Sequence, residues 1–169
     1  MIAPIRPPRA DELEALRAIE RDAGRAFAAI GMEEIARDEP PPVAELEAFR
    51  AAGRAWVAVD ERDRPVAYLL SSVLDGCAHV DQVSVAPSHA RRGLGAALID
   101  HLAATARTAL TLTTFRDVPW NGPYYERLGF TVVEPADQGL QLAALVRREA
   151  ARIPGDAPRV AMRRPIRRL

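Results

Sequence analysis

Two glycines, Gly93 and Gly95, stand where a helix-patterned segment begins. The loop before them carries two arginines, Arg91 and Arg92. The first amides of a helix have no intrahelical acceptor and lie at the positive end of the helix dipole, so an anion is their natural ligand. Glycine lets the backbone approach a phosphate closely, and arginines at the rim add charge. The stretch SVAPSHARRGLGAALIDHLA therefore predicts a phosphate or pyrophosphate site at the helix that begins near Leu94.

Other readings of the same glycines are a tight turn, a dinucleotide site and a Walker loop. A Rossmann dinucleotide site would place a third glycine where Leu98 stands and an acid about 20 positions further on, where TLTTF has none. A Walker loop needs a lysine, and all 23 lysine or arginine positions of this chain are arginine. The Walker loop is therefore excluded, and the dinucleotide site fits poorly.

The segments VSVAPSHARRGLGAALIDHL and NGPYYERLGF resemble the central motifs of the GNAT family of N-acetyltransferases. The resemblance is strongest over residues 77–134, and the order of the expected elements is similar from end to end. It implies acetyl-CoA (coenzyme A) as the cosubstrate and a primary amine of a small molecule or peptide as the acceptor. One departure is Ala90, where the family usually has Gln or Arg.

The resemblance implies a coenzyme A site in two parts. The backbone of Val83 and Val85, with Ser84 between them, would pair with the pantetheine arm like an added strand, so we expect the sheet to separate between residues 79–86 and 109–115. The loop amides would hold the pyrophosphate, from Arg91, Arg92, Gly93, Leu94, Gly95 and Ala96. Asn121 is expected to cap the next helix or to contact the cofactor.

Acyl transfer from a thioester needs a proton for the departing thiolate. In the family this donor is often a tyrosine in a YxxxGF segment, and Tyr125 holds that place in this chain. The alternatives are that Tyr125 only packs, or that Tyr124 is the donor because the short helix is rotated.

The base is expected on the strand before the glycines. Side chains alternate along a strand, so His79, Asp81, Val83 and Val85 share one face. If that face borders the cofactor, Asp81 and His79 point toward the same cleft. We expect Asp81 to bind or deprotonate the ammonium of the acceptor, directly or through water, with His79 as the second choice.

The acceptor is expected near the loop GMEEIARDEPP, where the family closes over its substrate. Glu34 is the acidic ligand proposed there for a cation, although acidic loops are usually only solvated. Phe115 and Trp120 flank the end of a strand and would line the acceptor pocket or belong to the core. No role is assigned to Cys77, His89 and His101.

Periodicity predicts the elements that position these residues. Helices are expected over 10–29, 43–53, 93–106, 121–129 and 140–153, and strands over 54–60, 66–76, 78–87, 109–115, 130–135 and 159–166. This order predicts a mixed α/β (α+β) fold with a mostly antiparallel central sheet flanked by helices, as a single domain over residues 1–169. The helix within 137–158 departs from the family and would cover the acceptor site, form a dimer surface or only decorate the fold.

The composition limits the kinds of partner and ligand that are expected. The 23 basic and 23 acidic residues balance, which disfavours nucleic acid and anionic membranes, although a nucleic-acid-binding domain remains a rival because of a basic C-terminal stretch. Its arginines are Arg159, Arg163, Arg164, Arg167 and Arg168. Cys77 is the only cysteine, so no disulfide and no metal is expected, and the chain is expected to be cytoplasmic, with a homodimer left open. The first rival function is an acyl-CoA sensor of the same fold without turnover.

Overall fold

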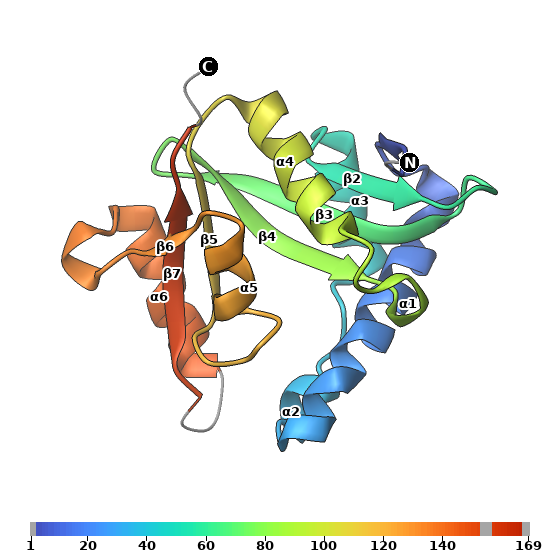
Figure 1. The fold of residues 1–169 in the computed structure, drawn as a ribbon. Helices are drawn as coiled ribbons and strands as arrows, with labels where there is room; N and C mark the ends of the chain where they lie inside the picture. Colours follow the sequence, from blue (N-terminus) through green and yellow to red (C-terminus); the bar gives the residue numbers. More distant parts are fainter. Residues whose placement is uncertain (1–2, 153–156, 167–169) are drawn as a thin grey trace. The chain divides into compact units, whose positions relative to one another are not determined.

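The computed structural model of the protein describes residues 3–152 and 157–166. The chain divides into two compact units (Figure 1). Unit 1 consists of Met1–Ser71 and Gln82–His101, and unit 2 consists of Ser72–Asp81 and Leu102–Leu169. The predicted helix end at Ile153, and Arg167 and Arg168 of the basic stretch, lie outside the described residues.

A seven-stranded sheet runs through both units in the order β1-β2-β3-β4-β5-β7-β6. The strands are β1 (Ile5–Arg6), β2 (Ala55–Val59), β3 (Pro65–Leu74), β4 (Cys77–Val85), β5 (Leu110–Phe115), β6 (Thr131–Val132) and β7 (Arg159–Arg164). β4 and β5 pair in parallel, whereas β1–β2, β2–β3, β5–β7 and β6–β7 are antiparallel. The mixed, mostly antiparallel sheet flanked by helices confirms the predicted fold class.

Three helices lie in unit 1, and a fourth begins there. They are α1 (Leu13–Gly24), α2 (Glu33–Ala36), α3 (Val43–Ala51) and α4 (Leu94–Ala106). On α1, Leu13, Leu16 and Ile19 are buried at the helical steps that the sequence predicts. The predicted helix 10–29 is longer than α1, because residues 25–30 tighten into a 3-10 turn. Among the described helices, none has the length and apolar character needed to cross a bilayer.

The core of unit 1 packs the apolar stripe of α1 and one residue of α3, Leu46, against β2 and β3. Its strand members are Ala55, Val57, Val59, Tyr68 and Leu70. Tyr68 is fully buried and donates a short hydrogen bond from its hydroxyl to the carboxylate of Glu20 on α1. The helix α1 is therefore joined to β3 by a polar contact as well as by apolar packing.

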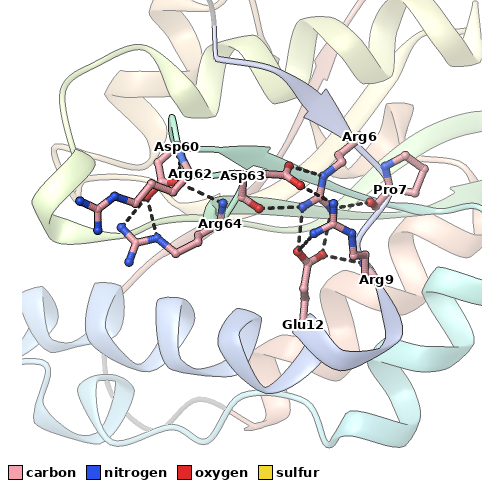
Figure 2. Close-up of polar contacts among 8 residues, drawn as sticks. All are labelled: Arg6, Pro7, Arg9, Glu12, Asp60, Arg62, Asp63 and Arg64. Carbon is pink, nitrogen blue, oxygen red and sulfur yellow. Dashed lines mark hydrogen bonds and ion pairs between the residues drawn. The ribbon is translucent and has the colours of Figure 1, made fainter.

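An ion-pair network fastens the N-terminal strand of unit 1 (Figure 2). The Arg6 guanidinium donates to both carboxylate oxygens of Glu12, at 2.9 and 2.7 Å, and to Oδ1 of Asp63 at 2.9 Å. Arg9 pairs with the same Asp63 carboxylate, which lies in the β2–β3 turn. The two-residue strand β1 is held this way. The sequence did not predict it, because two residues are too few to show a period.

Unit 2 contains α5 (Gly122–Arg127) and α6 (Leu140–Arg152). β5 and β7 pair along their whole length, and β6 pairs with the outer side of β7 (Figure 1). The predicted strand 130–135 shrinks to two residues, since Pro135 has no N–H for a ladder and begins a 3-10 turn. The predicted helix in the 137–158 segment is confirmed as α6.

The parallel ladder between β4 and β5 joins Ala78 to Leu110 and His79 to Thr111. Within unit 2, β4 continues to Asp81 and β5 continues to Phe115 without further pairs in the described register. Pairing that is limited to the first residues of both strands agrees with the expected separation of the sheet.

Candidate functional site

The loop from β4 to α4 carries the predicted anion site within unit 1. Arg91 and Gly93 both adopt left-handed backbone angles, with φ of 62° and 77°. For a residue with a side chain, such a conformation costs about 1–3 kcal/mol and persists only where the surroundings require it. Left-handed residues on either side of Arg92 turn the chain tightly, in the kind of backbone whose successive amides can face one concavity and bind an anion.

The first turn of α4 follows this loop directly. Its first intrahelical bond runs from the Ala97 amide to the Gly93 carbonyl oxygen, at 2.9 Å. The amides of Leu94, Gly95 and Ala96 therefore precede the helical ladder and have no acceptor within it. A Cβ built on Gly93 meets nothing within 4 Å, so its backbone conformation, and not a lack of space, favours glycine at this position.

The remaining cofactor candidates of unit 1 lie beside this turn. Arg91 and Arg92 are exposed, and the Arg92 guanidinium reaches the Ser88 carbonyl oxygen at 3.4 Å. On β4, Ser84 is buried and accepts a hydrogen bond from Gln82 Nε2 at 2.8 Å, whereas Val83 and Val85 are half-buried. The structure thus places the strand end, the loop and the helix start of the prediction consecutively in one unit.

The predicted proton donor, Tyr125, lies on the short helix α5 in unit 2. Asn121 occupies the N-cap position, and its carbonyl oxygen accepts from the Tyr125 amide at 3.0 Å. The Asn121 side chain makes no capping hydrogen bond, so the expected side-chain cap is wrong. The helix start is set by the next residue instead. A Cβ on Gly122 would lie 2.2 Å from the Arg116 carbonyl oxygen, an approach that only glycine permits.

Tyr125 is half-buried, with aromatic rings on two sides. Its ring centroid lies 5.3 Å from that of Tyr124 and 5.8 Å from that of Phe130, both edge to face. Burial raises the pKa of the Tyr125 phenol well above its ordinary value of 10, and the positive charge of Arg159 acts weakly in the opposite direction. The phenol is protonated at neutral pH, and the raised pKa makes it a weaker acid than an exposed tyrosine.

The two faces of the sheet in unit 2 carry different parts of the predicted machinery. The register pairs odd-numbered residues of β4, β5 and β7, and paired side chains point to the same face. The paired residues include His79, Thr111, Thr113, Phe115 and Arg159, and Asp81 shares their face because it lies two residues after His79 on β4. On the opposite face, the Arg164 guanidinium lies 5.3 Å from the ring of Phe130, which contacts Tyr125. The predicted acid and base thus belong to opposite faces of this sheet.

The two candidate bases differ in environment. The His79 side chain is buried, with Nδ1 at 2.9 Å from Thr111 Oγ1, and burial lowers the pKa of His79 to about 4. Asp81 is exposed, and its Oδ1 accepts from the Ser72 hydroxyl at 3.0 Å. The His79 imidazole is therefore closed to solvent, whereas Asp81 is the accessible one of the two candidates.

The predicted acceptor residues are divided between the units. In unit 1, Glu34 is exposed on α2, a helical turn inside the stretch that was expected to be a loop. This turn closes through a hydrogen bond from the Arg37 amide to the Glu33 carbonyl oxygen at 3.1 Å. In unit 2, Phe115 is only 4% exposed and Trp120 is 39% exposed. Phe115 therefore has the burial of a core residue, whereas Trp120 is open to solvent.

A family model described as the acetyltransferase (GNAT) family matches residues 13–130, which is more than half of the chain. The chain belongs to the GNAT family. The match takes in the loop before α4 and the segment of Tyr125, whereas α6 and β7 lie beyond it. Within the described residues, no three His, Cys, Asp or Glu side chains gather in a way that would hold a metal ion.

Solved GNAT structures share the fold over nearly the whole chain. A GNAT acetyltransferase from Staphylococcus aureus has a TM-score of 0.73 at 14% identity, covering 97% of this chain and 99% of its own. The PaiA N-acetyltransferase from Thermoplasma acidophilum, in complex with coenzyme A, has 0.69 at 12%, covering 98% and 99%. The ribosomal-protein-S18-alanine N-acetyltransferase from Escherichia coli has 0.68 at 18%, covering 99% and 96%. At these identities the likeness concerns the fold.

Three residues with defined roles in unit 2 were missed by the sequence prediction. Gly122 carried a weak signal, because Asn-Gly before a helix often marks a turn. Asp75 and the guanidinium of Arg159 carried none, because their partners lie far along the chain.

Proposed function

We propose that this protein transfers an acetyl group from acetyl-CoA directly to a primary amine of a small molecule or peptide. The observation that carries the proposal is the backbone of the α4 entry. Left-handed Arg91 and Gly93 lead into first-turn amides that have no helical acceptor, within the segment that matches the GNAT family. This backbone suits a pyrophosphate, the group that coenzyme A carries.

The other cofactor contacts follow from the family match. The backbone of Val83 and Val85, with Ser84 between them, would pair with the pantetheine arm, and the side chain of Asn121, which is not used as a helix cap, would be available to the cofactor. The positive charges of Arg91 and Arg92 would assist at the rim of the pyrophosphate site. The Thermoplasma acidophilum neighbour was solved in complex with coenzyme A, which supports the same cosubstrate here.

The chemistry assigns one step to each catalytic residue. The neutral amine attacks the thioester carbonyl carbon, and the carbon–sulfur bond then breaks to leave a thiolate. Tyr125 gives its phenolic proton to that thiolate, and Asp81 takes the proton that the amine loses, directly or through water. Glu34 and Trp120, both exposed, are the proposed acceptor contacts, whereas the burial of His79 and Phe115 speaks against a direct contact with the acceptor. In this proposal, both units act together as one domain of a cytoplasmic protein.

Paired glycine variants test the cofactor site. Gly93→Val and Gly53→Val place the same side chain at left-handed positions, with φ of 77° and 67°, and each Cβ would meet nothing within 4 Å. Both variants should lose similar stability, about 1–3 kcal/mol. Only Gly93→Val should lose coenzyme A affinity, by at least tenfold in isothermal titration calorimetry. Equal affinity in the two variants would refute the site.

Turnover is tested by thiol release from acetyl-CoA with a panel of amines. Release that depends on one class of amine supports the transferase and identifies the acceptor. Tight coenzyme A binding without release for any amine would favour an acyl-CoA sensor instead. Affinity for nucleic acid that falls steeply with salt would favour the nucleic-acid-binding alternative.

A further inference from the structure

The turn between β3 and β4 is a two-residue hairpin loop in unit 2. Asp75 and Gly76 both have positive φ, 49° and 76°, between the strand ends Leu74 and Cys77. This is the pattern of a type I′ turn, for which Asp-Gly is a preferred pair. The turn therefore explains the positive φ of Asp75, whereas the side chain of Asp75 contacts helix α6.

The Asp75 carboxylate caps the N-terminus of α6. Oδ1 accepts from the Gln141 amide at 3.1 Å and Oδ2 accepts from the Leu142 amide at 2.9 Å. In return, the Asp75 amide donates to Gln141 Oε1 at 2.6 Å. These bonds satisfy amides of the first helical turn and place a negative charge at the positive end of the helix dipole. Asp75 thus acts as an N-cap residue supplied by a distant segment.

Helix α6 has no capping side chain at its own N-cap position. The Ala143 amide donates to the Gly139 carbonyl oxygen at 2.9 Å, so Gly139 is at the N-cap position and has no side chain to cap with. A Cβ on Gly139 would lie 2.3 Å from Cγ of Asp75. Glycine at this position therefore makes room for the incoming carboxylate.

The other end of α6 is tied to the sheet by an ion pair. Glu149 Oε2 accepts from Arg159 Nη2 at 3.1 Å and from Nε at 3.3 Å. The same guanidinium donates to Thr113 Oγ1 at 3.2 Å and lies 4.7 Å from the centroid of the Phe115 ring. Leu142, in the first helical turn, is buried. The helix is therefore fixed at its N-terminal turn and near its C-terminus.

The Glu149–Arg159 ion pair lies on the same face of the sheet as Asp81, the proposed base. Thr113, Phe115 and Arg159 are on the odd-numbered face of the sheet in unit 2, the face that also carries Asp81. The contact between Glu149 and Arg159 places α6 over that face. A helix that the family resemblance does not predict thus covers the side of the sheet where the base is proposed.

We propose that Asp75 is a positioning residue for the amine acceptor. By capping α6, it holds the helix and its Glu149–Arg159 pair over the face that carries Asp81, and so sets the KM for the acceptor. The inference rests on the proposed function, because it takes the Asp81 face as the side from which the amine is bound.

Variants at Asp75 separate the cap from the turn. Asp75→Gly keeps a turn that tolerates positive φ but removes the carboxylate, and Asp75→Asn retains both the turn preference and a capping oxygen. Gly139→Ala displaces the carboxylate without removing it. Asp137→Ala is the matched control, because it removes an exposed acid two residues before Gly139 that has no capping role.

Two readouts decide the proposal. Amide hydrogen exchange in the first turns of α6 should quicken about fivefold in Asp75→Gly and Gly139→Ala, the fold-change expected for a lost cap, and should stay at the wild-type rate in Asp137→Ala. Asp75→Asn should lie between these rates, because its one side-chain oxygen can accept from only one of the two amides. The acceptor KM should rise several-fold in the first two variants only, with the affinity for coenzyme A unchanged.

Each contrary result has a defined meaning. Wild-type exchange in Asp75→Gly would overturn the cap. Faster exchange with an unchanged acceptor KM, or with an equal loss of coenzyme A affinity, would overturn the link to the acceptor. If the wild-type protein binds coenzyme A but no amine releases thiol, the proposed function fails and the link fails with it, while the exchange measurement still decides the role of Asp75 in holding α6.

Discussion

His79 Nδ1 lies 2.9 Å from Thr111 Oγ1, and the two residues are paired across the parallel strands β4 and β5. Both side chains are buried, and burial lowers the pKa of His79 from 6.5 to about 4. The burial explains why the imidazole is neutral at pH 7, and the contact with Thr111 gives it a hydrogen-bond partner inside the sheet. Asp81, on the same strand, is exposed, so it is the one of the two candidate bases that is open to solvent.

The first prediction concerns stability against pH. The unfolded chain protonates His79 near pH 6.5 and the folded chain only near pH 4, so the stability that the neutral side chain contributes is full above pH 6.5 and is lost as the pH falls toward 4. The loss from this group should be about 3 kcal/mol. Urea unfolding at pH 7 and pH 4.5 should show a weaker pH dependence in His79→Gln than in the wild type. His89→Gln, in the exposed loop, should keep the wild-type dependence, and a matching decrease there would contradict the assignment.

The second prediction concerns the proton donor. Tyr125→Phe keeps the ring packing against Phe130 but removes the hydroxyl, so turnover should fall about 10²-fold while coenzyme A affinity stays within twofold. Tyr124→Phe is the matched control on the same helix and should retain most of the activity. The opposite ranking in steady-state thiol-release kinetics would move the acid role to Tyr124.

The third prediction concerns the base. Asp81→Asn should lower kcat/KM for the amine about 10²-fold without changing coenzyme A affinity, because the amide can still accept from Ser72 but cannot take a proton. Asp117→Asn, an exposed acid in the same unit, should be close to wild type. Wild-type kcat/KM in Asp81→Asn, together with a strong loss in His79→Gln, would transfer the role to His79.

The fourth prediction concerns the start of α5. Gly122→Ala would place a methyl group 2.2 Å from the Arg116 carbonyl oxygen and should destabilise the fold by about 1–3 kcal/mol. Gly24→Ala is the control, since its Cβ would meet nothing within 4 Å and its φ is −61°. That variant should be neutral or slightly stabilising, by up to about 1 kcal/mol. Equal thermal stability of the two variants would contradict the close approach.

Elements with a long regular period were predictable from the chain alone. The apolar steps of α1 reflect burial on one side of a helix, which the order of residues encodes directly. β2 and β3 are buried on both faces over much of their length, so in the sequence they are short apolar runs bounded by turn residues. The shortest elements were not. β1 has two residues and α2 is one helical turn, so their backbones are determined by neighbours in space and not by a repeating pattern. β6 was predicted, but it keeps only two of the six residues that were expected.

Parts of the candidate site were likewise predictable from the sequence, and other parts were not. The glycines and arginines before α4 could be recognised because the anion chemistry of a helix start needs residues that are adjacent in sequence. The surroundings of Tyr125, His79 and Asp81 could not, since which side chains are buried depends on partners from other strands.

By itself, the sequence determined the fold class, the GNAT family of the central motifs and the place of the loop that we propose to bind an anion, because each depends on residues that are close together in the chain. Only the tertiary structure decided that His79 is buried against Thr111 and that Tyr125 and Asp81 belong to opposite faces of the sheet in unit 2. It also decided that α6 is capped by Asp75, 66 positions before Gln141. The strand register and the hairpin turn bring the Asp75 carboxylate to the first amides of α6, and this approach leaves no local pattern in the sequence.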